Sequence, residues 1–134
     1  MSATNLLSAT ITSTDGNNNV PINRGLGNPS YVGVFGGFAQ QSTSGLAGVD
    51  TPLPFPAGVV AILQLYIKNL AAPSGATLTV KWTPQGGALA TVQVLQPGSM
   101  IIFWQVASAG TAGVTSVTVN GSANNTPFEV FVGA

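Results

Sequence analysis

From Gly58 onward the chain is a series of short apolar stretches that alternate with polar residues and are separated by tight turns. The clearest stretch runs from Thr77 to Thr83, where Leu78, Val80 and Trp82 occupy one face. A period of two residues is typical of a half-buried β-strand. Such a strand must cover its apolar face with another layer of structure. No convincing helical segment is available for this, so the pattern predicts an all-β protein.

Glycine and proline residues mark the ends of these stretches at the spacing of about 8–12 residues that is typical of β-sandwiches. Gln96-Pro97-Gly98-Ser99 has Pro at the second position and Gly at the third, which predicts a type II turn. Residues 59–70 also fit a helical stripe, but their β-branched content and flanking Pro-Ala-Gly and Pro-Ser-Gly favour a strand. The seven or eight expected strands predict a single antiparallel β-sandwich, jelly-roll-like or Ig-like.

The first thirty residues differ from the rest of the chain in composition. Asn, Thr, Ser and Gly take the place of a core pattern, with Asp15-Gly16-Asn17-Asn18-Asn19 at the centre. A segment of this kind buries too little apolar surface to order by itself. We therefore expect two parts, a polar, low-complexity N-terminal arm at residues 1–30 and a sandwich at residues 31–134.

One strand is nevertheless expected inside the arm, from Leu6 to Thr14, because Leu6, Leu7 and Ile11 alternate imperfectly with polar residues. We expect it to add to the sheet edge of a neighbouring subunit, or to lie across the apolar face at Ile101 and Phe103. The alternative is that it is the first strand of its own sandwich.

Charge and composition exclude several functions. The chain has three Lys and Arg, three Asp and Glu, no His and no Cys, so only 4% of it is charged. Thiol nucleophiles, disulfides, Cys-based zinc sites and histidine bases are excluded. The separated cations form no basic patch, so no nucleic-acid partner is expected. The longest apolar run, Gly58 to Leu63, is far shorter than the ~20 residues of a membrane span, and the N-terminus lacks a secretory signal pattern.

The three acidic residues are the remaining candidates for chemistry, because a glycosidase needs only two carboxylates. Asp15 and Asp50 stand in turn-like sequence, and Glu129 alternates with Phe128 and Val130 as a solvent-facing strand residue would. Asp15-x-Asn17-x-Asn19 has the spacing that opens a calcium loop, but no acidic residue closes it. We therefore expect no enzyme activity, no catalytic or metal-binding residue and no cofactor.

Hydrophobic residues on both faces of the last strands are the most informative feature. Ile102, Trp104 and Val106 share one face of residues 100–106 and Ile101 and Phe103 the other, while Phe131 lies opposite Phe128, Val130 and Val132. A sandwich strand buries one face on its own core, so the second needs other cover. Either the chain's own N-terminal segment or a second subunit could supply it. We expect the second subunit, at the candidate interface residues Leu6, Leu7, Ile11, Tyr66, Ile101, Phe103 and Phe131. For Tyr66, beside Gln64 and Lys68, solvent and a partner are equally open.

Three segments in residues 63–102 resemble the β-meander of small decoration, cement or minor structural virion proteins of tailed bacteriophages. They are Leu-Gln-Leu-Tyr-Ile-Lys-Asn-Leu, Thr-Leu-Thr-Val-Lys-Trp-Thr-Pro and Val-Leu-Gln-Pro-Gly-Ser-Met-Ile. The resemblance implies a jelly-roll-like module at the surface of a virion or filament. It would assemble in many copies, with itself and a major capsid or other lattice protein as partners. The alternative is an extracellular carbohydrate-binding or adhesive module; an enzyme is a distant third.

Overall fold

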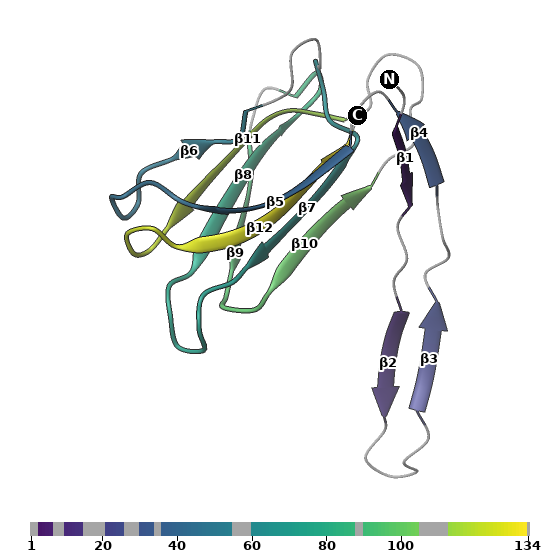
Figure 1. Ribbon diagram of the computed structural model, residues 1–134, viewed down its shortest axis with the longest axis horizontal. Helices are drawn as coiled ribbons and strands as arrows, with labels where there is room; N and C mark the ends of the chain where they lie inside the picture. Colours follow the sequence, from purple (N-terminus) through teal and green to yellow (C-terminus); the bar gives the residue numbers. More distant parts are fainter. Residues whose placement is uncertain are drawn as a thin grey trace.

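The computed structural model describes residues 3–6, 10–14, 21–25, 30–33, 36–54, 60–87, 90–104 and 113–133. Every helix or strand assigned in these ranges is a β-strand (Figure 1). The all-β prediction is therefore confirmed for the described residues. None of them lies in a helix long and apolar enough to cross a membrane.

Two antiparallel sheets of four strands each make up the main body (Figure 1). The first sheet has the order β10 (Met100–Trp104), β7 (Gln64–Asn69), β12 (Pro127–Gly133) and β5 (Gly36–Ser42). The second has the order β6 (Thr51–Pro52), β11 (Val114–Gly121), β8 (Leu78–Pro84) and β9 (Thr91–Leu95). This arrangement is a β-sandwich, as the spacing of strands and turns predicts.

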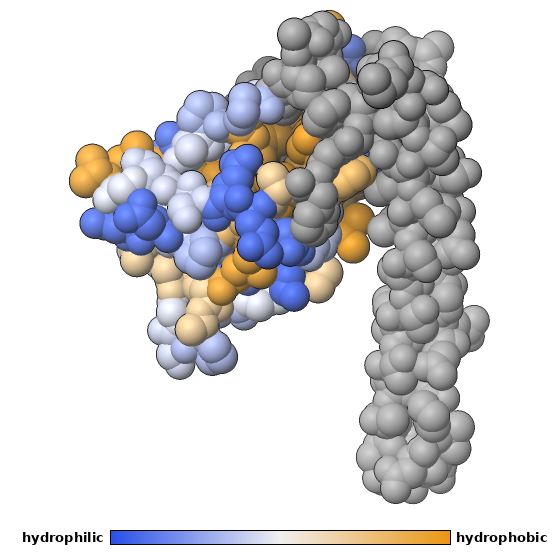
Figure 2. All heavy atoms as spheres, in the orientation of Figure 1, coloured by the Kyte–Doolittle hydropathy of each residue, from blue (hydrophilic) through white to orange (hydrophobic). Residues whose placement is uncertain are grey.

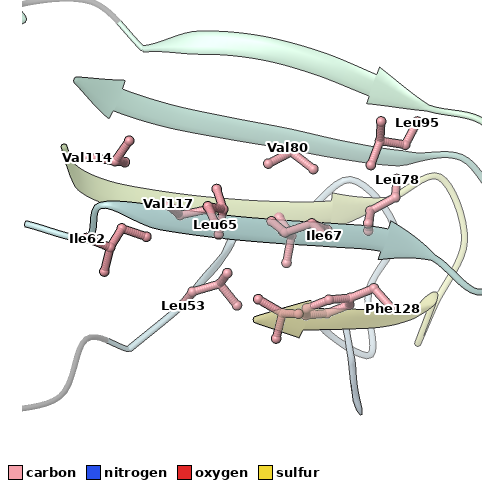
Figure 3. Close-up of a cluster of buried hydrophobic side chains, with 12 residues drawn as sticks. Leu53, Ile62, Leu65, Ile67, Leu78, Val80, Leu95, Val114, Val117 and Phe128 are labelled. Carbon is pink, nitrogen blue, oxygen red and sulfur yellow. The ribbon is translucent and has the colours of Figure 1, made fainter. Parts of the chain in front are cut away.

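The core lies between the two sheets, and both supply it (Figure 3). The predicted inward face of β8 is confirmed, because Leu78 and Val80 are fully buried and Trp82 is partly buried against the core. The complete buried cluster is Leu53, Ile62, Leu65, Ile67, Leu78, Val80, Leu95, Val114, Val117, Val119, Phe128 and Val130. All twelve are apolar, so burial of hydrocarbon surface holds the sheets together.

The chain crosses between the sheets just before β7. Ile62 bridges to Val114 of the second sheet through two backbone hydrogen bonds of 2.9 and 2.8 Å, and the chain then enters the first sheet at Gln64. The strand interpretation of residues 59–70 is therefore confirmed for residues 64–69. Gly113 has a φ of 106°, and a Cβ there would lie 2.7 Å from the Ile62 carbonyl oxygen. Glycine is required at this crossing because both the conformation and the space exclude a side chain.

A buried asparagine fixes the loop that follows β7. Asn69 is fully buried, and its Nδ2 donates to the carbonyl oxygens of Ala76 at 2.9 Å and Leu95 at 3.1 Å. Its Oδ1 accepts a hydrogen bond of 2.9 Å from the Ala71 amide. These bonds satisfy a polar group that would otherwise be costly to bury.

Four further strands pair only with one another. β1 (Ala3–Leu6) pairs with β4 (Ser30–Gly33), and β2 (Thr10–Thr14) pairs with β3 (Pro21–Gly25), nested between them. They are the purple and blue strands at the right of Figure 1. None of the four forms a ladder with either four-stranded sheet. The first strand that does is β5, which begins at Gly36.

Candidate interaction surface

The two faces of β10 are reversed relative to the interface prediction. Ile101 and Phe103 are partly buried and pack against the core, whereas Met100 and Ile102 are 50% and 42% exposed. The register explains this, since Ile101 lies opposite the buried Ile67 and residues directly opposite each other share a face. The expectation that Ile101 and Phe103 need cover from a partner is therefore corrected, because the sandwich itself covers them.

The outer face of the first sheet carries an apolar row that we define as Ile102, Tyr66 and Phe131. Ile102 of β10 lies directly opposite Tyr66 of β7, and Tyr66 lies opposite Phe131 of β12. Tyr66 and Phe131 are both half-buried. Of the predicted interface residues, Tyr66 and Phe131 are thus brought together.

A second row runs beside the first and contains Met100, Lys68, Glu129 and Gln40. The Tyr66 hydroxyl donates to Glu129 Oε1 at 2.9 Å, and Gln40 Nε2 donates to Glu129 Oε2 at 3.4 Å. Burial, reinforced by the hydrogen bond and charge of Glu129, raises the pKa of Tyr66 to about 12. Figure 2 shows hydrophilic and hydrophobic residues side by side on the visible part of the sandwich.

The second sheet carries a polar cluster on its outer face. Asp50 accepts hydrogen bonds from Lys81 Nζ at 2.8 and 3.0 Å and from Asn120 Nδ2. The hydrogen bonds from Lys81 and Asn120 lower the pKa of Asp50 below its usual value. Lys81 and Asp50 are 34% and 42% exposed, and exposed ion pairs of this kind contribute little to stability.

The candidate carboxylates are not brought together. Glu129 lies on the outer face of the first sheet and Asp50 on that of the second, so the two do not form the close pair that glycoside hydrolysis requires. Asp15 lies outside the described residues. Within the described ranges, no three His, Cys, Asp or Glu side chains are grouped so that they could hold a metal ion.

The remaining predicted residues belong to the N-terminal strands. Leu6 is the last residue of β1, and Ile11 lies in β2 opposite Arg24, while Leu7 is outside the described residues. Met100 was not predicted as an interface residue. Only the pairing of β10 with β7 identifies its outward position, because the sequence of β10 is apolar on both faces.

Comparisons of the chain with protein-family models, with curated proteins and with solved structures gave no match.

Proposed function

We propose that this protein is a non-enzymatic structural protein that self-assembles on, or decorates, a virion or filament lattice. The observation that carries the proposal is the apolar row on the outer face of the first sheet. In a free sandwich, that face would be expected to carry mainly polar residues. Instead, Ile102 is 42% exposed, and Tyr66 and Phe131 occupy the next two register positions across the sheet. A surface of this kind is suited to contact with another protein.

The strand order supports a jelly roll as the type of sandwich. Among the eight strands from β5 to β12, only β8 and β9 are both consecutive in the chain and neighbours in a sheet. The other connections pass from one sheet to the other, as the two interlocked Greek keys of a jelly roll require. An Ig-like sandwich has more hairpins within each sheet. Jelly rolls form the shells of many viruses, as well as lectin domains.

The low charge supports assembly as well. The whole chain has six charged side chains, and Lys81 and Asp50 neutralise each other on the second sheet. Little net charge remains to keep copies of the protein apart. In this proposal the strands β1 to β4 act as the N-terminal arm, which reaches a neighbouring subunit or the lattice protein.

The proposal is tested by substituting one member of the row. Phe131→Ser should leave the circular dichroism spectrum of a β-protein unchanged but reduce the assembled mass measured by light scattering. Val60→Ser is the matched control, because Val60 is 76% exposed and lies outside the apolar row. Loss of assembly in the Phe131 variant alone supports the proposal. Equal behaviour of both variants and the unmodified protein would contradict it.

One observation favours a carbohydrate-binding module as a second candidate. Tyr66 and Phe131 are neighbouring aromatic residues with Glu129, Lys68 and Gln40 beside them, which combines ring faces with polar groups as sugar recognition requires. This candidate predicts a monomer that binds a glycan, and Tyr66→Ala would abolish the binding. The structural-protein proposal predicts an oligomer for which no glycan is needed.

A further inference from the structure

The strand β10 is an unprotected sheet edge. It pairs with β7 on one side and, among the residues that the structure describes, forms no ladder on the other. Its sequence, Met-Ile-Ile-Phe-Trp, has no charge, Gly or Pro. Proteins usually protect edges with short strands, charges or proline. The edge strand β6 follows that rule, because it has two residues and ends at Pro52. The β10 edge is thus suited to pairing with another strand.

The backbone of β10 points its free groups outward at alternate residues. The Asn69 amide donates to the Ser99 carbonyl oxygen at 3.0 Å, so this opposed pair is hydrogen-bonded. In an antiparallel ladder such pairs alternate with non-bonded ones. Ile101 and Phe103 therefore direct their N–H and C=O groups toward β7. Met100, Ile102 and Trp104 direct theirs toward the free edge.

We propose that β10 pairs antiparallel with β10 of a second copy of this chain, about a two-fold axis beside Ile102. This inference rests on the self-assembly in the proposed function and adds a contact along the sheet edge to the contact through the outer face. Ile102 would then form a hydrogen-bonded pair with the partner's Ile102, and Met100 would face the partner's Trp104. The first sheets of the two copies would join into one continuous sheet.

Side-chain continuity favours a second copy as the occupant. A two-fold interface must be self-complementary, and this pairing continues the apolar row of one copy directly into that of the other. The charged residues of the first sheet are also compatible with this pairing. Lys68 is in register with Met100, so pairing aligns it with the partner's Gln64 rather than with the partner's Lys68. No like charges oppose one another across the new ladder.

The edge strand β9 of the second sheet is a poorer candidate. Val92 and Val94 of β9 are 55% and 48% exposed, but they stand in register with Lys81 and Thr79. Pairing through β9 would therefore extend polar rows instead of an apolar one. This makes a substitution on β9 a suitable control for the same substitution on β10.

A charge exchange at the axis tests the proposal. Ile102→Lys and Ile102→Glu are each expected to lose the dimer, because identical charges would face each other across the axis. An equimolar mixture of the two variants is expected to recover a dimer containing one copy of each, seen by native mass spectrometry. Val94→Lys is the control and should retain the mass of the unmodified protein.

Each other outcome overturns the pairing. If the unmodified protein assembles and the Ile102 variants assemble equally well, the β10 pairing is wrong while the proposed function stands. If the mixture of the two Ile102 variants does not recover a dimer, a different segment occupies the β10 edge. If only the Val94 variant loses the dimer, the contact lies at β9 instead. If the unmodified protein remains monomeric, the proposed self-assembly itself is wrong. If the variants do not fold, amide exchange at Ile102 of the unmodified protein decides, since the pairing predicts slower exchange on assembly.

Discussion

Alkaline pH should destabilise the fold through a single hydroxyl group. Tyr66 has its pKa raised from 10.0 to about 12, first by burial and then by the hydrogen bond and charge of Glu129. The folded protein therefore favours the neutral phenol more strongly than the unfolded chain does. The resulting stabilisation is complete below about pH 10 and is lost as pH rises through about 12. Each pKa unit corresponds to about 1.4 kcal/mol, so the loss should be about 3 kcal/mol.

The assay compares the unmodified protein with Tyr66→Phe. Urea unfolding from about pH 9 to about pH 12 should show the extra loss only in the unmodified protein, because other titrating groups are common to both. The chain has only two tyrosines, Tyr31 and Tyr66, so an absorbance titration of the two proteins isolates the Tyr66 phenolate. Glu129→Gln should lower the Tyr66 pKa but keep it above 10.0, since burial is the larger cause. Parallel pH profiles for the unmodified protein and Tyr66→Phe would refute this reasoning.

Three further predictions test the fold, one of them with a control substitution. Asn69→Ala removes three hydrogen bonds from a buried position and should lower the free energy of unfolding by about 2–4 kcal/mol. The control Asn124→Ala removes one exposed hydrogen bond and should lower the free energy of unfolding by less than about 1 kcal/mol. Equal effects of the two substitutions in urea unfolding would show that the buried Asn69 bonds are worth no more than an exposed one. Gly113→Ala should cost about 1–3 kcal/mol because of its positive φ and the backbone oxygen 2.7 Å from the new Cβ; an unchanged thermal midpoint would be inconsistent with this. Lys81→Met should change stability at neutral pH by less than about 1 kcal/mol, since its partner Asp50 is exposed, and a larger change would show that the pair is worth more than surface pairs generally are.

The fold class could be predicted from the segments in which only one face of the strand is apolar. Residues 77–83 are apolar on one face only, so the buried face of β8 followed from alternation. The turn at residues 96–99 was equally predictable. Gly98 has a φ of 79°, as the third position of a type II turn needs, and the Ser99 amide donates to the Gln96 carbonyl oxygen at 2.9 Å.

Alternation fails where both faces are apolar. In β10 either set of side chains fits a core, so the choice between Ile101 and Ile102 as the outward residue depends on the register with β7. That register is a long-range property and has no local signature. Gln64 was expected on the polar face with Tyr66 and Lys68, yet it is fully buried. Polar residues enter interiors when tertiary hydrogen bonds satisfy them, and a single sequence does not reveal those bonds.

The apolar row was therefore only partly predictable. Tyr66 and Phe131 were identified as candidates because each is a large residue opposite a core-facing set on its strand. Their position side by side, and the continuation to Ile102 at the sheet edge, required the order β10–β7–β12 and its register.

The most direct test of the central claim, association through the first sheet, is the mass of the unmodified full chain by sedimentation equilibrium over a range of concentrations. Self-association predicts masses that rise with concentration to multiples of 13.4 kDa. A constant mass of 13.4 kDa at every concentration would contradict self-association, because the β10 edge would then have no partner copy.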